Sequence, residues 1–170
     1  DVVEFGLPYS DPVMDGPVIQ HAVDHALAGG TRVRDVLGAV EQIAETGAPV
    51  LVMTYWNPVL RYGVDAFARD LAGAGCAGLI TPDLIPDEGA QWLAASEEHD
   101  LDRVSLVAPS STPERPAMTS AAPPGFASAA PPPGATGARP TARARPAQPV
   151  ADTRAARAPP VCPALGGPRP

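Results

Sequence analysis

The 170-residue sequence predicts a parallel α/β fold, either an open sheet or a barrel. Its short apolar runs are rich in Val, Leu and Ile and do not alternate with polar residues, which is typical of strands buried on both faces. The segments between these runs have helical periodicity, so strands and helices alternate along the chain as consecutive βα units. An all-parallel sheet needs helices to cover it, and this alternation supplies them.

Four strands are predicted from the apolar runs. They are expected at residues 2–5 (V-V-E-F), 50–53 (V-L-V-M), 77–80 (A-G-L-I) and 104–108 (V-S-L-V-A). A closed eight-stranded barrel takes roughly 250 residues. We therefore expect a chain of this length to form only part of a barrel.

Two helices are predicted between the first two strands. The first begins at Pro17, which suits the first turn of a helix, and ends at the Gly-Gly pair at 29–30. The second spans residues 31–46, with Thr31 as its N-cap and Gly47 just past its end. Apolar residues recur in both at helical spacing, so each is expected to present one apolar face.

Two later segments also have helix signals. A helix is expected to open at Pro86, with Asp87 and Glu88 in its first turn, where acids complement the helix dipole. The G-A-G-C-A-G run at 73–78 matches a dinucleotide-binding pattern, but it follows a helix and precedes a strand, the reverse of such a site. We interpret it as a helix end and a tight turn.

The composition divides the chain near residue 109. Residues 1–108 carry 17 acids and 5 arginines (net −12), whereas residues 109–170 carry 2 acids and 7 arginines (net +5) and hold 16 of the 23 prolines. Proline removes a backbone donor and breaks helices. We predict well-patterned βα units in 1–108 and a Pro/Ala/Arg-rich remainder, of which residues 138–170 alone are typical of a disordered tail.

The residue content of the sequence also excludes several classes of protein. No run approaches the roughly 18 apolar residues of a membrane span, and no basic, apolar leader opens the chain, which starts at Asp1 like a fragment or a trimmed chain. Cys76 and Cys162 are too few for a disulfide scaffold, so we expect reduced thiols and a cytoplasmic protein. Lysine is absent, so a Schiff-base nucleophile cannot be built.

The densest signal for a functional site lies in residues 4–17, E-F-G-L-P-Y-S-D-P-V-M-D-G-P. Glu4 is predicted at the C-terminal end of the first strand, where parallel α/β folds place their active sites. Asp15 follows on a Gly- and Pro-rich loop that can fold back over the strand end. An acid in an apolar strand costs free energy unless it is paired or protonated. Two alternatives stay open: Glu4 pairs with an arginine, and Asp15 caps the next helix.

Five strings, in matching order and spacing, resemble the tryptophan synthase alpha chain family over nearly all of residues 1–115. The S-D-P…D-G-P loop is the most specific of them. The strings are P-Y-S-D-P-V-M-D-G-P-V-I-Q at 8–20, M-T-Y-W-N-P at 53–58, Y-G at 62–63, P-D-L-I-P-D-E at 82–88 and L-V-A-P-S-S-T at 106–112.

The resemblance implies a phosphate-binding (β/α)8 TIM barrel that cleaves indole-3-glycerol phosphate to indole and glyceraldehyde 3-phosphate. This retro-aldol cleavage needs the indole ring protonated at C3, its N–H polarised and a proton removed from the side-chain hydroxyl. Two carboxylates in unlike environments can divide that work. By position, Glu4 is implied as the general acid/base and Asp15 as the partner of the indole nitrogen. The missing lysine fits, because the reaction uses neither an imine nor a metal.

Further substrate contacts are implied by the same resemblance. Met53 and Tyr55 correspond to the wall of the indole pocket, although core packing is an equal alternative for Tyr55. Asp83 ends the next predicted strand, where the family has an acid near the mouth of the substrate site.

A partner interface is implied as well. Ser10, Asp11 and Pro12 correspond to a mobile loop that meets the beta subunit, and Asn57 and Pro58 correspond to interface surface. For Ser10, Asp11 and Pro12 the simplest alternative is a turn defined by proline. The family forms an alpha2-beta2 tetramer in which pyridoxal phosphate belongs to the beta subunit, so no cofactor is expected in this chain.

The remainder of the chain keeps three landmarks of the family and is interpreted as a degraded continuation of the same barrel. Residues 125–130, 134–139 and 160–166 fall where the family has its sixth strand, closing loop and seventh strand. The resemblance implies four site residues there. Phe126 is an aromatic position near the substrate, and Thr136 is a loop threonine that closes toward the site. Gly137 and Gly166 are backbone parts of the phosphate site. Interior prolines are expected to prevent this half of the barrel from forming.

Other functions are weaker alternatives. His21 and His25 have ligand spacing on a predicted helix, but a solvated face is favoured because the glutamate of a zinc-protease motif is missing. The arginines of the tail lack interleaved aromatics, so no nucleic-acid partner is expected. Indole-3-glycerol phosphate synthase relies on catalytic lysines, which this chain lacks. A non-catalytic fragment that at most binds the beta subunit stays open.

Overall fold

The computed structural model describes residues 2–11, 13–85, 88–107, 127–129 and 161–163, and these contain one parallel sheet. Its six strands follow chain order, each paired with the next. They are β1 (Val3–Gly6), β2 (Val50–Met53), β3 (Gly78–Thr81), β4 (Asp102–Val107), β5 (Ala127–Ala129) and β6 (Val161–Pro163).

The strand order favours a barrel over an open doubly wound sheet. Each connection moves one strand further in the same direction, and right-handed crossovers then place the helices on one side of the sheet. A doubly wound sheet reverses direction instead. The described sheet therefore has the strand order of part of a (β/α)8 TIM barrel.

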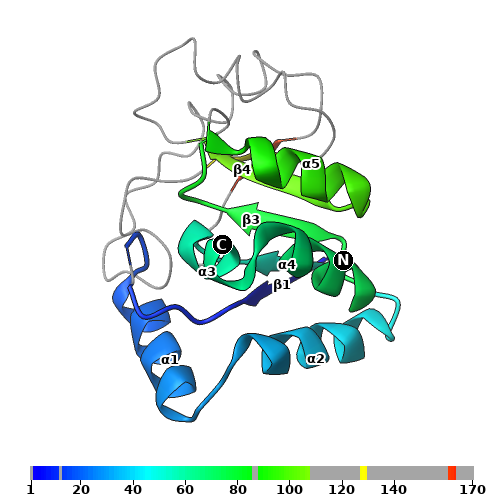
Figure 1. The fold of residues 1–170 in the computed structure, drawn as a ribbon. Coiled ribbons are helices and arrows are strands. Elements are labelled where there is room, and N and C mark those ends of the chain that lie inside the picture. The colour runs from blue at the N-terminus through cyan, green and yellow to red at the C-terminus, as the bar shows by residue number, and fades with distance from the viewer. Residues whose placement is uncertain (1, 12, 86–87, 108–126, 130–160, 164–170) are drawn as a thin grey trace.

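Five helices accompany the described strands and follow one another along the sheet, with α1 and α2 at the β1 end and α5 beside β4 (Figure 1). They are α1 (Pro17–Ala28), α2 (Val33–Ala44), α3 (Trp56–Tyr62), α4 (Val64–Gly73) and α5 (Ala90–Glu98). None of the described helices is long and apolar enough to span a membrane.

Two predicted helix starts are wrong. The N-cap of α2 is Arg32 rather than Thr31, because the Asp35 carboxylate in the first turn accepts the Arg32 backbone N–H at 2.7 Å. The helix expected from Pro86 begins at Ala90 instead, after a short turn that includes Glu88. The observed start of α2 is thus one residue later than predicted, and that of α5 is four residues later.

The segment between β2 and β3 holds two helices. Gly63 separates them with a φ of 97°, a conformation that side chains other than glycine rarely adopt. Pro58 lies in the first turn of α3, where its missing N–H has no intrahelical partner to lose. The aromatic and proline-rich M-T-Y-W-N-P string therefore starts a helix, which the sequence did not indicate.

The predicted turn at 73–78 is confirmed. Gly73 ends α4, Gly75 has a φ of 78°, and Gly78 opens β3. A Cβ at Gly78 would overlap the backbone of Asp102 on β4, so these two strands can approach only because residue 78 is glycine.

The two faces of the sheet have separate apolar clusters. On the helix side, Val50, Val52 and Leu79 pack in the main core. On the opposite, inner face, a smaller cluster contains Leu51, Ile80 and Val104 with Met53 and Ala77. The prediction of strands buried on both faces is therefore correct for β2 and β3.

The same prediction is wrong for β1, which alternates in burial along Val3–Gly6. Phe5 packs toward the helix-side core, whereas Glu4 and Gly6 are exposed on the inner face beside Leu51 and Met53. Because β1 is the first strand of the described sheet, its inner face has a neighbour on one side only.

Two short strands form in the region where prolines were expected to prevent folding. β5 lies within the 125–130 landmark and pairs with β4, and β6 lies within the 160–166 landmark and pairs with β5. Pro163 is the last residue of β6, which is the last strand in the described order, a position that tolerates a missing donor. That expectation is wrong for these six residues.

Candidate functional site

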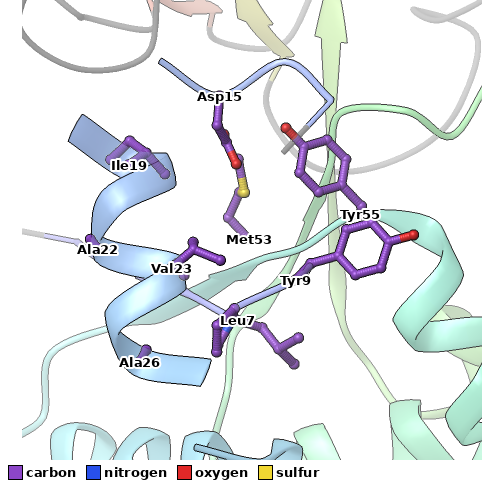
Figure 2. Close-up of a pocket in the computed structure, with 11 residues that line it drawn as sticks. Leu7, Tyr9, Asp15, Ile19, Ala22, Val23, Ala26, Met53 and Tyr55 are labelled. Atoms are coloured by element: carbon purple, nitrogen blue, oxygen red, sulfur yellow. The ribbon is translucent and has the colours of Figure 1, made fainter. Parts of the chain in front are cut away.

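A pocket of about 210 Å³ lies beyond the carboxyl ends of β1 and β2, against α1 (Figure 2). Its lining comes from residues 6–9 at and just beyond the end of β1, from Met53 and Tyr55 around the end of β2, from Asp15, and from one face of α1. It is smaller than the ~300–1,000 Å³ of most ligand pockets, and it is mostly apolar with one carboxylate. The carboxyl ends of parallel strands are where this fold class places its active sites.

Asp15 supplies the ionisable group of the pocket. Its Oδ1 is buried without a hydrogen-bond partner. Burial raises the pKa of the Asp15 carboxyl, and a hydrogen bond from Tyr55 partly offsets the rise. The capping alternative for Asp15 does not hold, because the N-cap of α1 is Gly16 and no side chain caps that helix. Its backbone oxygen instead accepts the Gln20 side-chain N–H at 2.7 Å.

Tyr55 links β2 to the loop that carries Asp15. The residue is 3% exposed, and its hydroxyl accepts the Met14 backbone N–H at 3.0 Å and hydrogen-bonds the Asp15 carboxylate. Burial is the largest of the effects that raise the pKa of Tyr55 to about 12, so the phenol keeps its proton at neutral pH. Tyr55 is thus buried and also lines the pocket, and its contact with a ligand stays a prediction.

Glu4 lies on the inner face of the sheet, opposite Leu51 in register, and does not line the pocket as described. Glu4 is exposed overall, but partial burial of its carboxyl raises the pKa of that group. Among the described ion pairs, none joins Glu4 to an arginine, so that alternative finds no support.

Asp83 has a structural role that the sequence did not indicate. Both of its carboxylate oxygens lie 3.0 Å from the backbone N of Trp56, the first residue of α3. An acid at a helix N-terminus satisfies an otherwise unpaired donor and complements the helix dipole. Asp83 is exposed and does not line the pocket, and its predicted substrate contact stays a prediction.

The residues predicted at the partner interface are largely at the surface. Ser10 and Asp11 are exposed and hydrogen-bonded to each other at 2.9 Å. Asn57 is exposed, and Pro58 beside it is half-buried. Pro12 lies outside the described residues, as do four predicted substrate residues: Phe126, Thr136, Gly137 and Gly166.

Two parts of the pocket lining were not predicted from the sequence. Tyr9 lines it, with its ring centroid 5.8 Å from that of Tyr55. The apolar face of α1, which includes Ile19 and Val23, forms another wall. Helical spacing predicted this face, but spacing alone does not say whether a face packs on a sheet or lines a cavity.

Within the described part of the chain, one group of side chains has metal-ligand geometry. Asp65, Glu98 and His99 place one ligand atom each within 4.8 Å of the others, on α4 and at the end of α5. None of the three lines the pocket. His21 and His25 are both exposed on α1, as expected for a solvated face.

Comparison with known proteins decides the family. The sequence model of the tryptophan synthase alpha chain matches residues 1–166. The chain belongs to the tryptophan synthase alpha chain family. The alpha chain of Mycobacterium marinum is 71% identical over 129 residues, which are 76% of this chain and 48% of that protein. The chain spans about half the length of the curated alpha chains that it matches.

Solved structures agree with this family. Tryptophan synthase of Mycobacterium tuberculosis superposes with a TM-score of 0.91 at 62% identity, covering 98% of this chain and 63% of that one. A mutant alpha subunit from Pyrococcus furiosus superposes with a TM-score of 0.71 at 30% identity, covering 75% of this chain and 52% of that one. The alpha-chain resemblance deduced from the five strings is therefore confirmed.

Proposed function

We propose that this chain carries the alpha reaction of tryptophan synthase, the retro-aldol cleavage of indole-3-glycerol phosphate to indole and glyceraldehyde 3-phosphate. The observation that carries the proposal is the Asp15 carboxylate, which presents a buried and unpartnered Oδ1 at an apolar pocket. A buried acceptor without a partner is costly unless a ligand supplies a donor. The N–H of an indole ring is such a donor on an otherwise apolar, planar molecule.

Glu4 and Asp15 divide the chemistry in this proposal. Breaking the carbon–carbon bond requires a proton at C3 of the indole and removal of a proton from the side-chain hydroxyl. Glu4 delivers and takes these protons as general acid/base, and Asp15 stabilises the positive charge that develops on the ring nitrogen. The raised pKa of Glu4 brings its protonated form closer to neutral pH, which suits an acid.

Tyr55 and Met53 support the ring in this arrangement. Both line the pocket beside Asp15, where their side chains offer apolar surface to a planar ligand. The Tyr55 phenol stays protonated at neutral pH, so its hydroxyl donates to Asp15 while the other carboxylate oxygen accepts from the ligand. The phosphate group is assigned to Thr136, Gly137 and Gly166 by resemblance alone.

The assembly is proposed on the same basis. A tryptophan synthase beta subunit would dock on Ser10, Asp11 and Pro12 and on Asn57 and Pro58, in an alpha2-beta2 tetramer in the cytoplasm. Pyridoxal phosphate would belong to the beta subunit, and the alpha chain itself would need no cofactor. The exposure of Ser10, Asp11 and Asn57 supports this docking surface.

Indole release tests the proposal. The purified chain is mixed with beta subunit and indole-3-glycerol phosphate, and indole is followed with time. We expect activity that Glu4→Gln abolishes and that Asp15→Asn lowers by at least 100-fold, consistent with the ~10²–10⁴-fold contribution of a general acid or base. Glu41→Gln is the matched control, because Glu41 is exposed on α2 outside the pocket and should leave the rate unchanged.

The alternative function is a non-catalytic chain that only binds the beta subunit. The feature that favours it is the proline-rich remainder of the sequence, because residues 109–170 hold 16 of the 23 prolines. Binding to beta subunit in a pull-down with no indole released at any chain concentration would establish this alternative. If the chain neither binds the beta subunit nor releases indole, both functions are refuted.

A further inference from the structure

Two tyrosine rings stand side by side at the edge of the pocket. Tyr9 and Tyr55 have ring centroids 5.8 Å apart with a 47° angle between the ring planes. Both residues line the pocket, although they are 46 positions apart in sequence. Figure 2 shows the Tyr55 hydroxyl turned toward the loop that carries Asp15, whereas the Tyr9 hydroxyl points away from it.

The Tyr55 hydroxyl holds the end of that loop. It accepts the Met14 backbone N–H at 3.0 Å and hydrogen-bonds the Asp15 carboxylate, so it contacts two consecutive residues. Tyr55 itself is fixed, because it is 3% exposed and is the N-cap residue of α3. The position of residues 14–15 therefore depends on the side chain of Tyr55, which follows β2.

The Tyr9 hydroxyl fastens the beginning of the same loop. It accepts the side-chain N–H of Asn57 at 3.0 Å, and Asn57 is the second residue of α3. The loop between β1 and α1 is thus attached to residues 55–57 at two points, with the two rings in contact between them. Neighbouring Ser10 and Asp11 are exposed, with their side chains hydrogen-bonded only to each other among the described contacts.

We propose that Tyr9 is a positioning residue: the bond from Asn57 holds its ring against Tyr55, and this tyrosine pair sets where Asp15 sits in the pocket. The catalytic meaning of this placement rests on the function proposed above, but the placement itself does not. Aromatic pairs at this separation contribute favourably beyond their buried area. Displacement of a reacting group by about 1 Å costs on the order of 100-fold in rate, so the anchor of the loop matters for catalysis.

The exchange of the Met14 amide hydrogen tests the placement without requiring catalysis. Tyr9→Phe removes only the hydroxyl, and Asn57→Ala removes its donor. We expect each to speed exchange of the Met14 amide about two- to tenfold, the range set by the loss of one ordinary hydrogen bond. The double variant should be no faster than either single variant, because both changes break the same bond.

Tyr62→Phe is the matched control. Tyr62 lies on the same helix as Asn57, and its hydroxyl donates to Asp70 at 2.7 Å, away from the pocket. It should leave the Met14 amide unchanged while also losing one tyrosine hydrogen bond. Circular dichroism of every variant shows whether the fold is kept, and if Tyr9→Phe does not fold, Asn57→Ala carries the test.

A second readout follows Asp15 directly. The hydrogen bond from Tyr55 lowers the pKa of the Asp15 carboxyl, so loosening the tyrosine pair should raise that pKa in a carboxyl NMR titration of Tyr9→Phe. An unchanged Met14 exchange rate together with an unchanged Asp15 titration would overturn the proposal, and so would additive effects in the double variant. Faster exchange in a chain that releases no indole would support the placement while refuting the proposed function.

Discussion

The carboxylate of Asp83 should stabilise the fold by capping α3, and Asp83→Ala removes it. Both Asp83 oxygens lie 3.0 Å from one donor, the Trp56 backbone N–H, so one shared hydrogen bond is lost rather than two. Loss of an N-terminal cap costs about 0.5–2 kcal/mol, and loss of an acid at the positive end of the helix dipole adds ~0.3–1 kcal/mol. Because Asp83 is exposed and solvent screens its charge, we expect a total of about 1–2 kcal/mol.

Urea unfolding followed by circular dichroism measures this loss. The midpoint should fall while the slope m stays constant, since the surface exposed on unfolding is unchanged. Asp24→Ala is the matched control, because Asp24 is exposed within α1, and alanine there favours the helix. Asp83→Asn keeps one acceptor oxygen and should lose less than the alanine variant. If Asp83→Ala and Asp24→Ala unfold at the same urea concentration, the capping argument is wrong.

Three further outcomes are expected. Gly78→Ala should lower the free energy of unfolding measured in urea by about 1–3 kcal/mol, because the new methyl group overlaps Asp102. Gly38→Ala on α2 should raise it by roughly 0.5–1 kcal/mol, because the new methyl group meets nothing within 4 Å, and equal shifts for the two variants would contradict this. Burial raises the pKa of the Glu4 carboxyl, so ionisation of Glu4 above its unfolded-state pKa lowers the stability of the fold. Glu4→Gln should therefore raise the melting temperature at pH 7 but not at pH 3, and a lower melting temperature at pH 7 would refute this. The Cys76 thiol is 7% exposed with a pKa raised by burial, so mass spectrometry should find it unalkylated at pH 8 unless urea is added.

Most of the local structure was predictable because it depends on neighbours in sequence. Apolar runs predicted β2 and β3, and Pro17 with the Gly-Gly pair predicted α1 to within a residue. The errors have a common cause. A single side-chain contact, such as Asp35 with the Arg32 backbone, moves a helix start by a turn or less, and residue preferences do not resolve such differences.

The site was predicted in part. Asp15, Met53 and Tyr55 were selected from their strings, and the structure brings all three to one pocket. Tyr9 and the capping role of Asp83 were not, because each depends on a contact with the 55–57 segment, dozens of positions away. Glu4 lies on the inner face of the sheet and does not line this pocket, so its predicted role stays a prediction.

The sequence by itself determined the family, the βα repeat and the identity of the acids, because motifs, periodicity and residue chemistry are local properties. Only the tertiary structure decided which groups meet. Parallel pairing of β1 with β2 brings the loop after Gly6 beside Tyr55, and there burial raises the pKa of Asp15 while the hydrogen bond from Tyr55 lowers it. These effects require the desolvation and the fixed distances that exist only after distant segments have packed together.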